Sequence, residues 1–202
     1  VSKGSTVKNV NVMRAAVLMG HGDIDQLQVR EDMPIPRPGR EEVLIRVGAS
    51  AVNNTDINTR VGWYSQSRSE ADAAWSGNPM KFPRIQGADC CGQITSVGSA
   101  IDPARIGERV LVRTMQEPVN VDGDLIPITL GSEIEGAFAE YLSVRASEAF
   151  VIDSPLDDAE LASFPCSYST AEGLLQRARV GAERVLITGA SGGVGSAAVQ
   201  LA

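Results

Sequence analysis

Three glycines near the end of the chain restrict its fold more than any other feature of the sequence. Gly189, Gly192 and Gly195 form a GxxGxxG pattern directly after the apolar run 185–188 and before a segment of small residues. This order predicts a strand, a tight turn and a helix, as at the start of a parallel α/β unit. Such glycines let backbone N–H groups approach the pyrophosphate of a dinucleotide at the positive end of the helix.

The residues of this turn are candidates for cofactor binding. They are Gly189, Ser191, Gly192, Gly193, Val194 and Gly195. Small residues at a strand-to-helix turn also serve packing without any ligand, and this alternative stays open. The residue that separates NAD from NADP is expected about 20 residues past the turn, so the 202 residues do not decide between them. Because one βαβ unit needs roughly 30 residues or more, we expect the chain to be part of a longer enzyme.

The rest of the chain divides into two further regions. Residues 14–152 carry short β-branched or alternating apolar runs separated by Gly and Pro, a pattern that predicts a β-barrel or β-sandwich. Residues 153–182 predict two helices, the first with Asp and Glu in its first turn and the second stopped by Gly181. Residues 183–202 then begin the α/β unit described above.

Composition excludes several classes of function. The net charge of −7 and the pI near 4.8 would repel a phosphodiester backbone, so no nucleic-acid partner is expected. No apolar run approaches the ~18 residues of a membrane span, so no membrane partner is expected. Three cysteines, of which Cys90 and Cys91 are adjacent, predict a cytoplasmic protein without structural disulfides. Strand alternation places at least one of these two thiols in the core, where thiols are inert.

The stretches FPCSYSTAEGLL and VLITGASGGVGSAAVQLA, which follow the β-rich region, resemble the medium-chain dehydrogenase/reductase superfamily, closest to its zinc-independent, quinone-oxidoreductase-like branch. The resemblance implies a mixed fold, with a GroES-like β-barrel catalytic domain at 14–152, linking helices at 153–182 and the start of a Rossmann domain at 183–202. It also implies a small-molecule substrate and a nicotinamide cofactor, NADP or alternatively NAD. Thr170 resembles the family threonine that lies against the nicotinamide, although a Thr near a helix N-terminus needs no function to explain it.

Zinc-dependent members of this superfamily hold a catalytic zinc with two cysteines and a histidine. Here Asn53 stands in place of the first cysteine, Ala88 in place of the histidine, and only Cys166 matches a ligand position. One ligand of three cannot hold a tetrahedral zinc, so no zinc is expected. The resemblance then implies hydride transfer from a reduced nicotinamide to a quinone, an enone or another activated carbonyl.

Three polar residues are the catalytic candidates, as hydrogen-bond donors to the acceptor oxygen: Asn53, Thr55 and Tyr64. Each has an alternative role, since Asn53 could cap the following helix and Tyr64 could serve loop packing. Asp56 is expected to fix the loop through backbone hydrogen bonds rather than to act as a base.

Two other functions stay open from the sequence. One is an alcohol dehydrogenase of the same superfamily, and the other is a non-enzymatic GroES-like structural or assembly module. We also expect a homo-oligomer, in the simplest case a dimer. The predicted strand at 185–188 would have an unpaired edge and the helix that contains Leu201 would have an uncovered apolar face.

Overall fold

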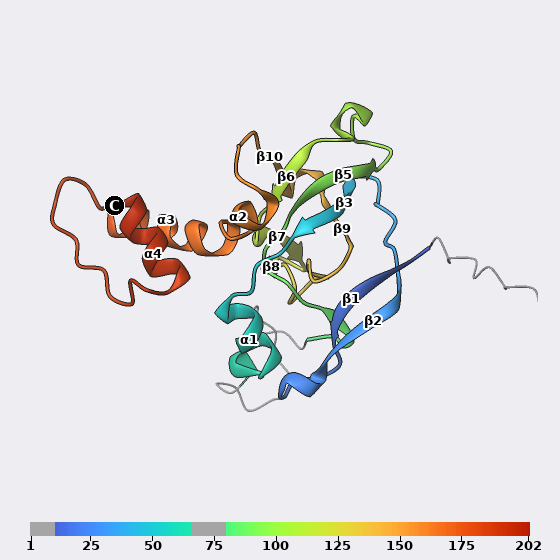
Figure 1. The fold of residues 1–202 in the computed structure, drawn as a ribbon, viewed down its shortest axis with the longest axis horizontal. Helices are drawn as coiled ribbons and strands as arrows, with labels where there is room; N and C mark the ends of the chain where they lie inside the picture. Colours follow the sequence, from blue (N-terminus) through green and yellow to red (C-terminus); the bar gives the residue numbers. More distant parts are fainter. Residues whose placement is uncertain (1–10, 66–79) are drawn as a thin grey trace, which may run out of the picture.

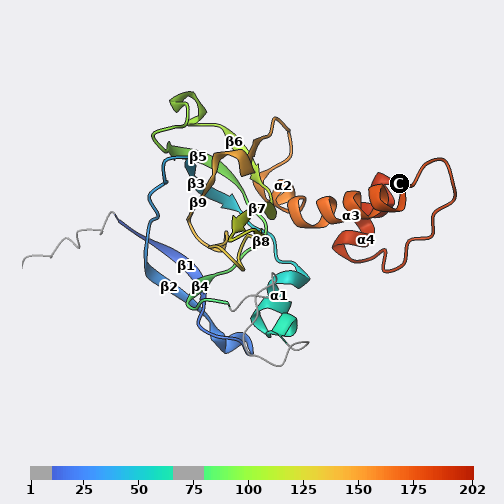
Figure 2. The ribbon, with the colours of Figure 1, turned by 180° about the vertical axis from the view of Figure 1, so that it is seen from behind.

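The computed structural model describes residues 11–65 and 80–202 of the chain. Its strands, in chain order, are β1 (Val12–Leu18), β2 (Leu27–Pro34), β3 (Glu42–Ala49), β4 (Arg84–Ile85), β5 (Cys91–Val97), β6 (Arg109–Val112), β7 (Met115–Val121), β8 (Asp124–Thr129), β9 (Tyr141–Arg145) and β10 (Ala149–Val151). Its α-helices are α1 (Asn54–Arg60), α2 (Asp158–Ala162), α3 (Pro165–Ala178) and α4 (Gly193–Leu201). Figures 1 and 2 show, from opposite sides, a body of strands with α3 and α4 projecting from it.

The strands form two antiparallel sheets and a hairpin. The larger sheet has the order β10-β6-β5-β3-β9, the smaller has the order β2-β1-β4, and β7 pairs with β8. In β3, Ile45 pairs with Ile94 of β5 on one side and with Leu142 of β9 on the other. Since alternate residues of a strand share a face, Val43 points to the same interior as Ile45. The β-rich region is therefore present where the sequence predicted it.

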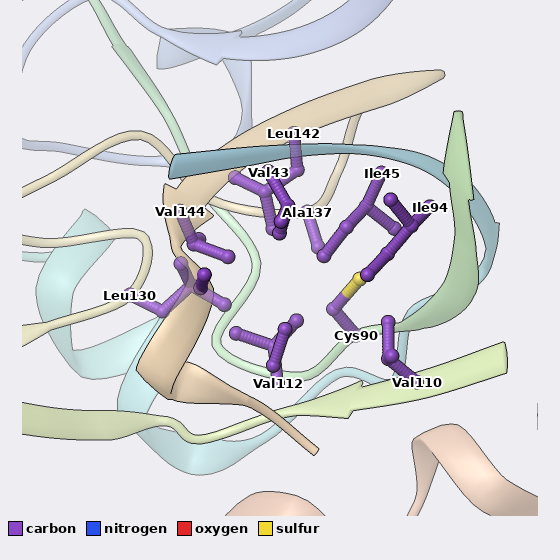
Figure 3. Packing of buried hydrophobic residues seen from close by; sticks show 12 residues of the cluster. Val43, Ile45, Cys90, Ile94, Val110, Val112, Leu130, Ala137, Leu142 and Val144 are labelled. Carbon is purple, nitrogen blue, oxygen red and sulfur yellow. The ribbon is translucent and has the colours of Figure 1, made fainter. Parts of the chain in front are cut away.

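Buried apolar side chains from β3, β5, β6 and β9 and from the segments between strands converge on one interior, as Figure 3 shows. The labelled members are Val43, Ile45, Cys90, Ile94, Val110, Val112, Leu130, Ala137, Leu142 and Val144. Full burial of one Val, Leu or Ile side chain stabilises the fold by roughly 1.5–3 kcal/mol. Cys90 and Cys91 are both fully buried, which confirms that at least one is a core residue. Burial raises the pKa of both thiols, that of Cys91 to about 11.

The helix α2 is held against the larger sheet by packing and by an ion pair. Leu161 packs on Cys91, and the Oδ1 atom of Asp158 forms an ion pair with Arg109 and accepts a hydrogen bond from its Nε atom at 2.7 Å. A Cβ atom on Gly48 of β3 would lie 2.0 Å from the Oδ2 atom of Asp158. Glycine at this position therefore leaves room for the Asp158 side chain beside β3.

Alanines pack α3 against α4. Ala171, Ala197 and Ala198 are buried in one cluster, so small side chains set a short distance between the two helices. The longest helix, α3, has 14 residues. No helix in the described ranges is long and apolar enough to cross a bilayer.

The end of α3 differs from the prediction by a few residues. The helix ends at Ala178 rather than near Gly181, because Arg179 adopts a left-handed φ of 53°. The N–H of Val180 then donates to the carbonyl of Leu175 at 3.1 Å, which closes the helix early.

The prediction of a strand at 185–188 is wrong for the described structure. These residues pair with no described strand, and Leu186 is 90% exposed. A strand requires hydrogen bonds to a neighbouring strand, and apolar propensity alone does not supply them. The turn and the helix α4 that follow form as predicted, so the opening of the α/β unit is present without a sheet.

Candidate active site

Asn53 stands at the N-cap of α1, in an extended conformation. Its backbone N–H donates to the Oδ2 atom of Asp56 at 2.8 Å, and its side-chain Nδ2 donates to the Oδ2 atom of Asp89 at 2.7 Å. Its position agrees with the capping alternative, while its side chain is directed to a second carboxylate. Since an amide nitrogen carries two hydrogens, one N–H of Nδ2 can serve another acceptor.

Asp56 fixes the loop, as the sequence predicted. Its Oδ2 atom accepts from the backbone of Asn53, and its Oδ1 atom accepts from the backbone N–H of Ala88 at 3.0 Å. Its own carbonyl accepts from Nε2 of Gln86 at 3.0 Å. Burial raises the pKa of Asp56 from 3.8 to about 6, and these backbone donors oppose the increase.

Asp89 is a fully buried carboxylate that sequence reasoning missed as a site residue. Its Oδ2 atom accepts from Asn53, and its Oδ1 atom accepts from the backbone N–H of Cys166 at 2.7 Å. The hydroxyl of Thr114 lies 3.3 Å from the same Oδ1 atom and donates to the carbonyl of Ala88 at 2.9 Å. Burial raises the pKa of Asp89, while the donors lower it. In the sequence it stands as an acidic residue within an apolar, core-bound stretch.

Two of the three predicted catalytic residues come together. The Thr55 hydroxyl in α1 and the Tyr64 hydroxyl in the short turn Trp63–Ser65 lie 3.1 Å apart, and either can be the donor. Both residues are half-buried. The ring of Trp63 meets that of Tyr64 edge to face at 5.3 Å. Since Asn53 lies just before α1, all three candidates belong to one segment around this helix.

The residues at the zinc-ligand positions do not fit a zinc ion. Ala88 is buried and has no donor atom, and the amide of Asn53 is engaged with Asp89. Cys166 is the one residue at these positions with a metal-binding atom, and burial, together with the charges of Asp89 and Asp56, raises the pKa of its thiol to about 12. No three His, Cys, Asp or Glu side chains within residues 11–65 and 80–202 are grouped to hold a metal ion.

The glycine turn has the geometry of an anion site. Gly189 has a left-handed φ of 65°, and a Cβ atom on Gly195 would lie 2.2 Å from the carbonyl oxygen of Gly189. The N–H of Ser196 donates to the carbonyl of Gly192 at 2.8 Å, closing the first turn of α4. The N–H groups of Gly193, Val194 and Gly195 precede this bond and have no acceptor within the helix. Together with the helix dipole they fit a phosphate group.

Thr170 and Ser191 occupy different environments. The Thr170 hydroxyl donates to the carbonyl of Cys166, one turn earlier in α3, at 2.7 Å, which agrees with the alternative that needs no function. Ser191 is exposed within the turn. The roles of both residues toward a cofactor stay predictions.

A cavity of about 610 Å³ lies apart from these residues. It is lined by residues of β2, β9 and the β7–β8 hairpin, among them Met33, Tyr141 and Gln116. None of the predicted catalytic residues is among the described residues that line it, so this cavity is not the candidate active site.

Known proteins are similar to this chain over nearly its whole length. A family model described as the alcohol dehydrogenase GroES-like domain matches residues 39–154. Human quinone oxidoreductase is 32% identical over 193 residues, which are 95% of this chain and 50% of that protein. The chloroplastic NADPH-dependent alkenal/one oxidoreductase of Arabidopsis thaliana is 27% identical over 191 residues, which are 94% of this chain and 44% of that protein.

A solved structure shows the same likeness in three dimensions. A Sinorhizobium meliloti 1021 protein, provisionally named an alcohol dehydrogenase, matches with a TM-score of 0.82 at 41% identity. The match covers 95% of this chain and 54% of that one. The chain spans about half the length of the relatives it matches. The expected fold class, a GroES-like β-barrel followed by the start of a Rossmann-type α/β unit, is confirmed.

Proposed function

We propose that this chain, which belongs to the medium-chain dehydrogenase/reductase superfamily, forms the catalytic barrel and the opening of the nucleotide-binding unit of an NAD(P)H-dependent oxidoreductase. The enzyme transfers hydride to a quinone, an enone or another activated carbonyl without zinc. One observation carries this proposal: Asn53, which stands at a zinc-ligand position of the zinc-dependent members, donates instead to the buried Asp89, beside Ala88, which has no ligand atom. The proposed division is 14–152 for the catalytic domain, 153–182 for the linking helices and 183–202 for the nucleotide-binding unit.

The nucleotide is bound mainly by backbone donors of this chain. The N–H groups of Gly193, Val194 and Gly195 at the N-terminus of α4 would hold the pyrophosphate, and the Ser191 hydroxyl would add a further donor. Thr170 of α3, the helix that packs on α4, would lie against the nicotinamide. The bound cofactor supplies the hydride, and the acceptor must already be activated because no metal polarises it.

The side chains around α1 stabilise, by hydrogen bonding, the negative charge that develops on the acceptor oxygen. Tyr64 and Thr55 share one hydrogen bond, so one of their two hydroxyl protons is left to donate to that oxygen. The second N–H of Asn53 provides another donor. A well-placed donor in a site that excludes water lowers the barrier by roughly 3 kcal/mol.

The cofactor and the assembly are also proposals. We favour NADP over NAD because the relative from Arabidopsis thaliana is named NADPH-dependent. A homodimer in the cytoplasm is the proposed state, as the sequence predicted.

Alcohol oxidation is the second candidate function. It is favoured by the provisional name of the solved protein that is 41% identical. A metal-free site disfavours it, because an unpolarised alcohol is a poor hydride donor.

A steady-state comparison tests the proposal. Oxidation of NADPH by an enone and by a quinone is measured against reduction of NADP by primary and secondary alcohols, with NADH and NAD in parallel. We expect turnover with the enone or quinone and little with the alcohols. Turnover confined to the alcohols would favour the second candidate and overturn the first.

A further inference from the structure

One buried carboxylate joins the two halves of the proposed site. Asp89 is fully buried, and its two oxygens accept from the Asn53 side chain and from the backbone of Cys166, both at 2.7 Å. Asn53 precedes α1, whereas Cys166 is the second residue of α3. Within the described residues Asp89 forms no ion pair, so neutral donors alone compensate its burial.

The first turn of α3 depends on this carboxylate. Phe164 at the N-cap makes no side-chain capping bond, and Pro165 has no N–H to donate. The N–H of Cys166 is thus an unsatisfied helix-terminal donor that the Oδ1 atom of Asp89 satisfies from outside the helix. A negative charge at a helix N-terminus is also favoured by the helix dipole.

The same carboxylate fixes the orientation of the Asn53 amide. Because Asp89 accepts and cannot donate when ionised, the Nδ2 atom of Asn53 must face it. The amide oxygen then points away, and the second N–H keeps a defined direction. An amide flip would place two acceptors against each other in a buried site, which costs a hydrogen bond.

We propose that Asp89 is a positioning residue that sets the Asn53 donor of the barrel relative to α3, and through α3 relative to the glycine turn. The second link is the packing of α3 on α4 through Ala171 and Ala197, with a Cβ on Gly193 lying 3.4 Å from that of Ser167. This inference rests on the proposed function for its catalytic part. Its structural part, the pair of hydrogen bonds, stands independently of turnover.

Substitutions at Asp89 separate the two hydrogen bonds. Asp89→Ala removes both. In Asp89→Asn the side-chain oxygen can still accept from the N–H of Cys166. Its NH2 group then faces the NH2 group of Asn53, so two donors meet and the Asn53 amide must flip.

The double variant Asn53→Asp with Asp89→Asn restores the hydrogen bond, now donated by residue 89 to residue 53, while it removes the Asn53 donor. Asp157→Asn is the matched control, because Asp157 caps α2 at 2.8 Å and has no contact with Asn53.

The structural part is tested in the 202-residue chain, where no turnover is needed. The hydrogen-exchange rate of the Cys166 backbone amide and the unfolding free energy are measured for each variant. Asp89→Ala should accelerate this exchange by about tenfold or more, as loss of a charge-assisted bond does. Asp89→Asn and the double variant should stay within about threefold of wild type, as should Asp157→Asn. Unchanged exchange in Asp89→Ala would overturn the structural part, whether or not the chain turns over any substrate.

Enone turnover then tests positioning. In the enzyme that contains this chain, Asp89→Asn should lower kcat about tenfold or more while KM for the nucleotide changes little, because it turns the Asn53 donor away. Asn53→Ala removes that donor, so adding Asp89→Asn to Asn53→Ala should lower kcat no further. A merely structural role of Asp89 predicts the same additional loss of kcat with and without Asn53, and that result would overturn the proposal. Absence of turnover in wild type would instead count against the proposed function, with the exchange result still deciding the role of Asp89 in holding α3.

Discussion

Gly195→Ala perturbs the glycine turn in a way that the distances define. A Cβ atom on Gly195 would lie 2.2 Å from the carbonyl oxygen of Gly189, 2.7 Å from its carbonyl carbon and 2.8 Å from the Cα atom of Ala190. All three are backbone atoms, so no side-chain rotation relieves the clash and the turn itself must move. Inserting a methyl group into a packed site costs about 1–3 kcal/mol.

This shift should reach the nucleotide. It would move the N–H groups of Gly193 and Val194 away from the pyrophosphate. Loss of one hydrogen bond to a charged group costs about 1.5–3 kcal/mol, so the affinity for NADPH should fall by about 10- to 150-fold, since 1.4 kcal/mol is tenfold. The assay is titration of the protein with NADPH, followed by the fluorescence of its two tryptophans. Gly173→Ala in α3 is the control, because a Cβ there meets nothing within 4 Å and Ala favours a helix. Equal affinity in Gly195→Ala and wild type would refute the assignment of the turn.

Three further changes have defined outcomes. Tyr64→Phe removes one hydroxyl of the pair with Thr55, so kcat for an enone should fall roughly 100-fold with little change in KM; an unchanged kcat would exclude Tyr64 as a donor. Burial raises the pKa of Asp56 from 3.8 to about 6, so its contribution to stability is full below about pH 4 and is lost as the pH rises through about 6. Asp56→Asn removes this dependence, and its unfolding free energy relative to wild type should rise between pH 4 and 7; parallel pH curves from urea unfolding would contradict it. Gly48→Ala places a Cβ 2.0 Å from the Oδ2 atom of Asp158. This should displace the carboxylate and lower the unfolding free energy by about 1–3 kcal/mol. An unchanged midpoint of urea unfolding would contradict this expectation.

Local patterns predicted much of the fold. Short β-branched or alternating apolar runs predicted strands within 14–152, and Val43 and Ile45 of one such strand, β3, are both fully buried. The glycine turn predicted the start of a helix, and α4 begins at Gly193. These features depend on residues close together in the sequence, so the chain itself carries the information.

Features that depend on distant partners were missed. The strand expected at 185–188 requires a paired neighbour, which no described segment provides, so its apolar residues did not suffice. The convergence of Asn53 and Cys166 on Asp89 joins residues 36 and 77 positions from that carboxylate. No periodicity links such positions, and only the folded chain brings them together.

Of the proposed donors, Thr55 and Tyr64 could be paired only after folding. Their spacing of nine residues does not match a helical repeat, because Tyr64 lies beyond the end of α1 in a separate turn. The sequence analysis predicted both residues as donors but did not indicate that their hydroxyl groups form a hydrogen bond with each other.

The most direct test of a zinc-free hydride transfer is NADPH oxidation with an enone by chelator-treated protein, measured before and after Zn²⁺ is added back. We predict that turnover is the same in untreated, chelated and zinc-supplemented protein, because Ala88 offers no ligand and Asn53 is held by Asp89. Loss of turnover on chelation, with recovery when one equivalent of zinc binds, would contradict a metal-free site.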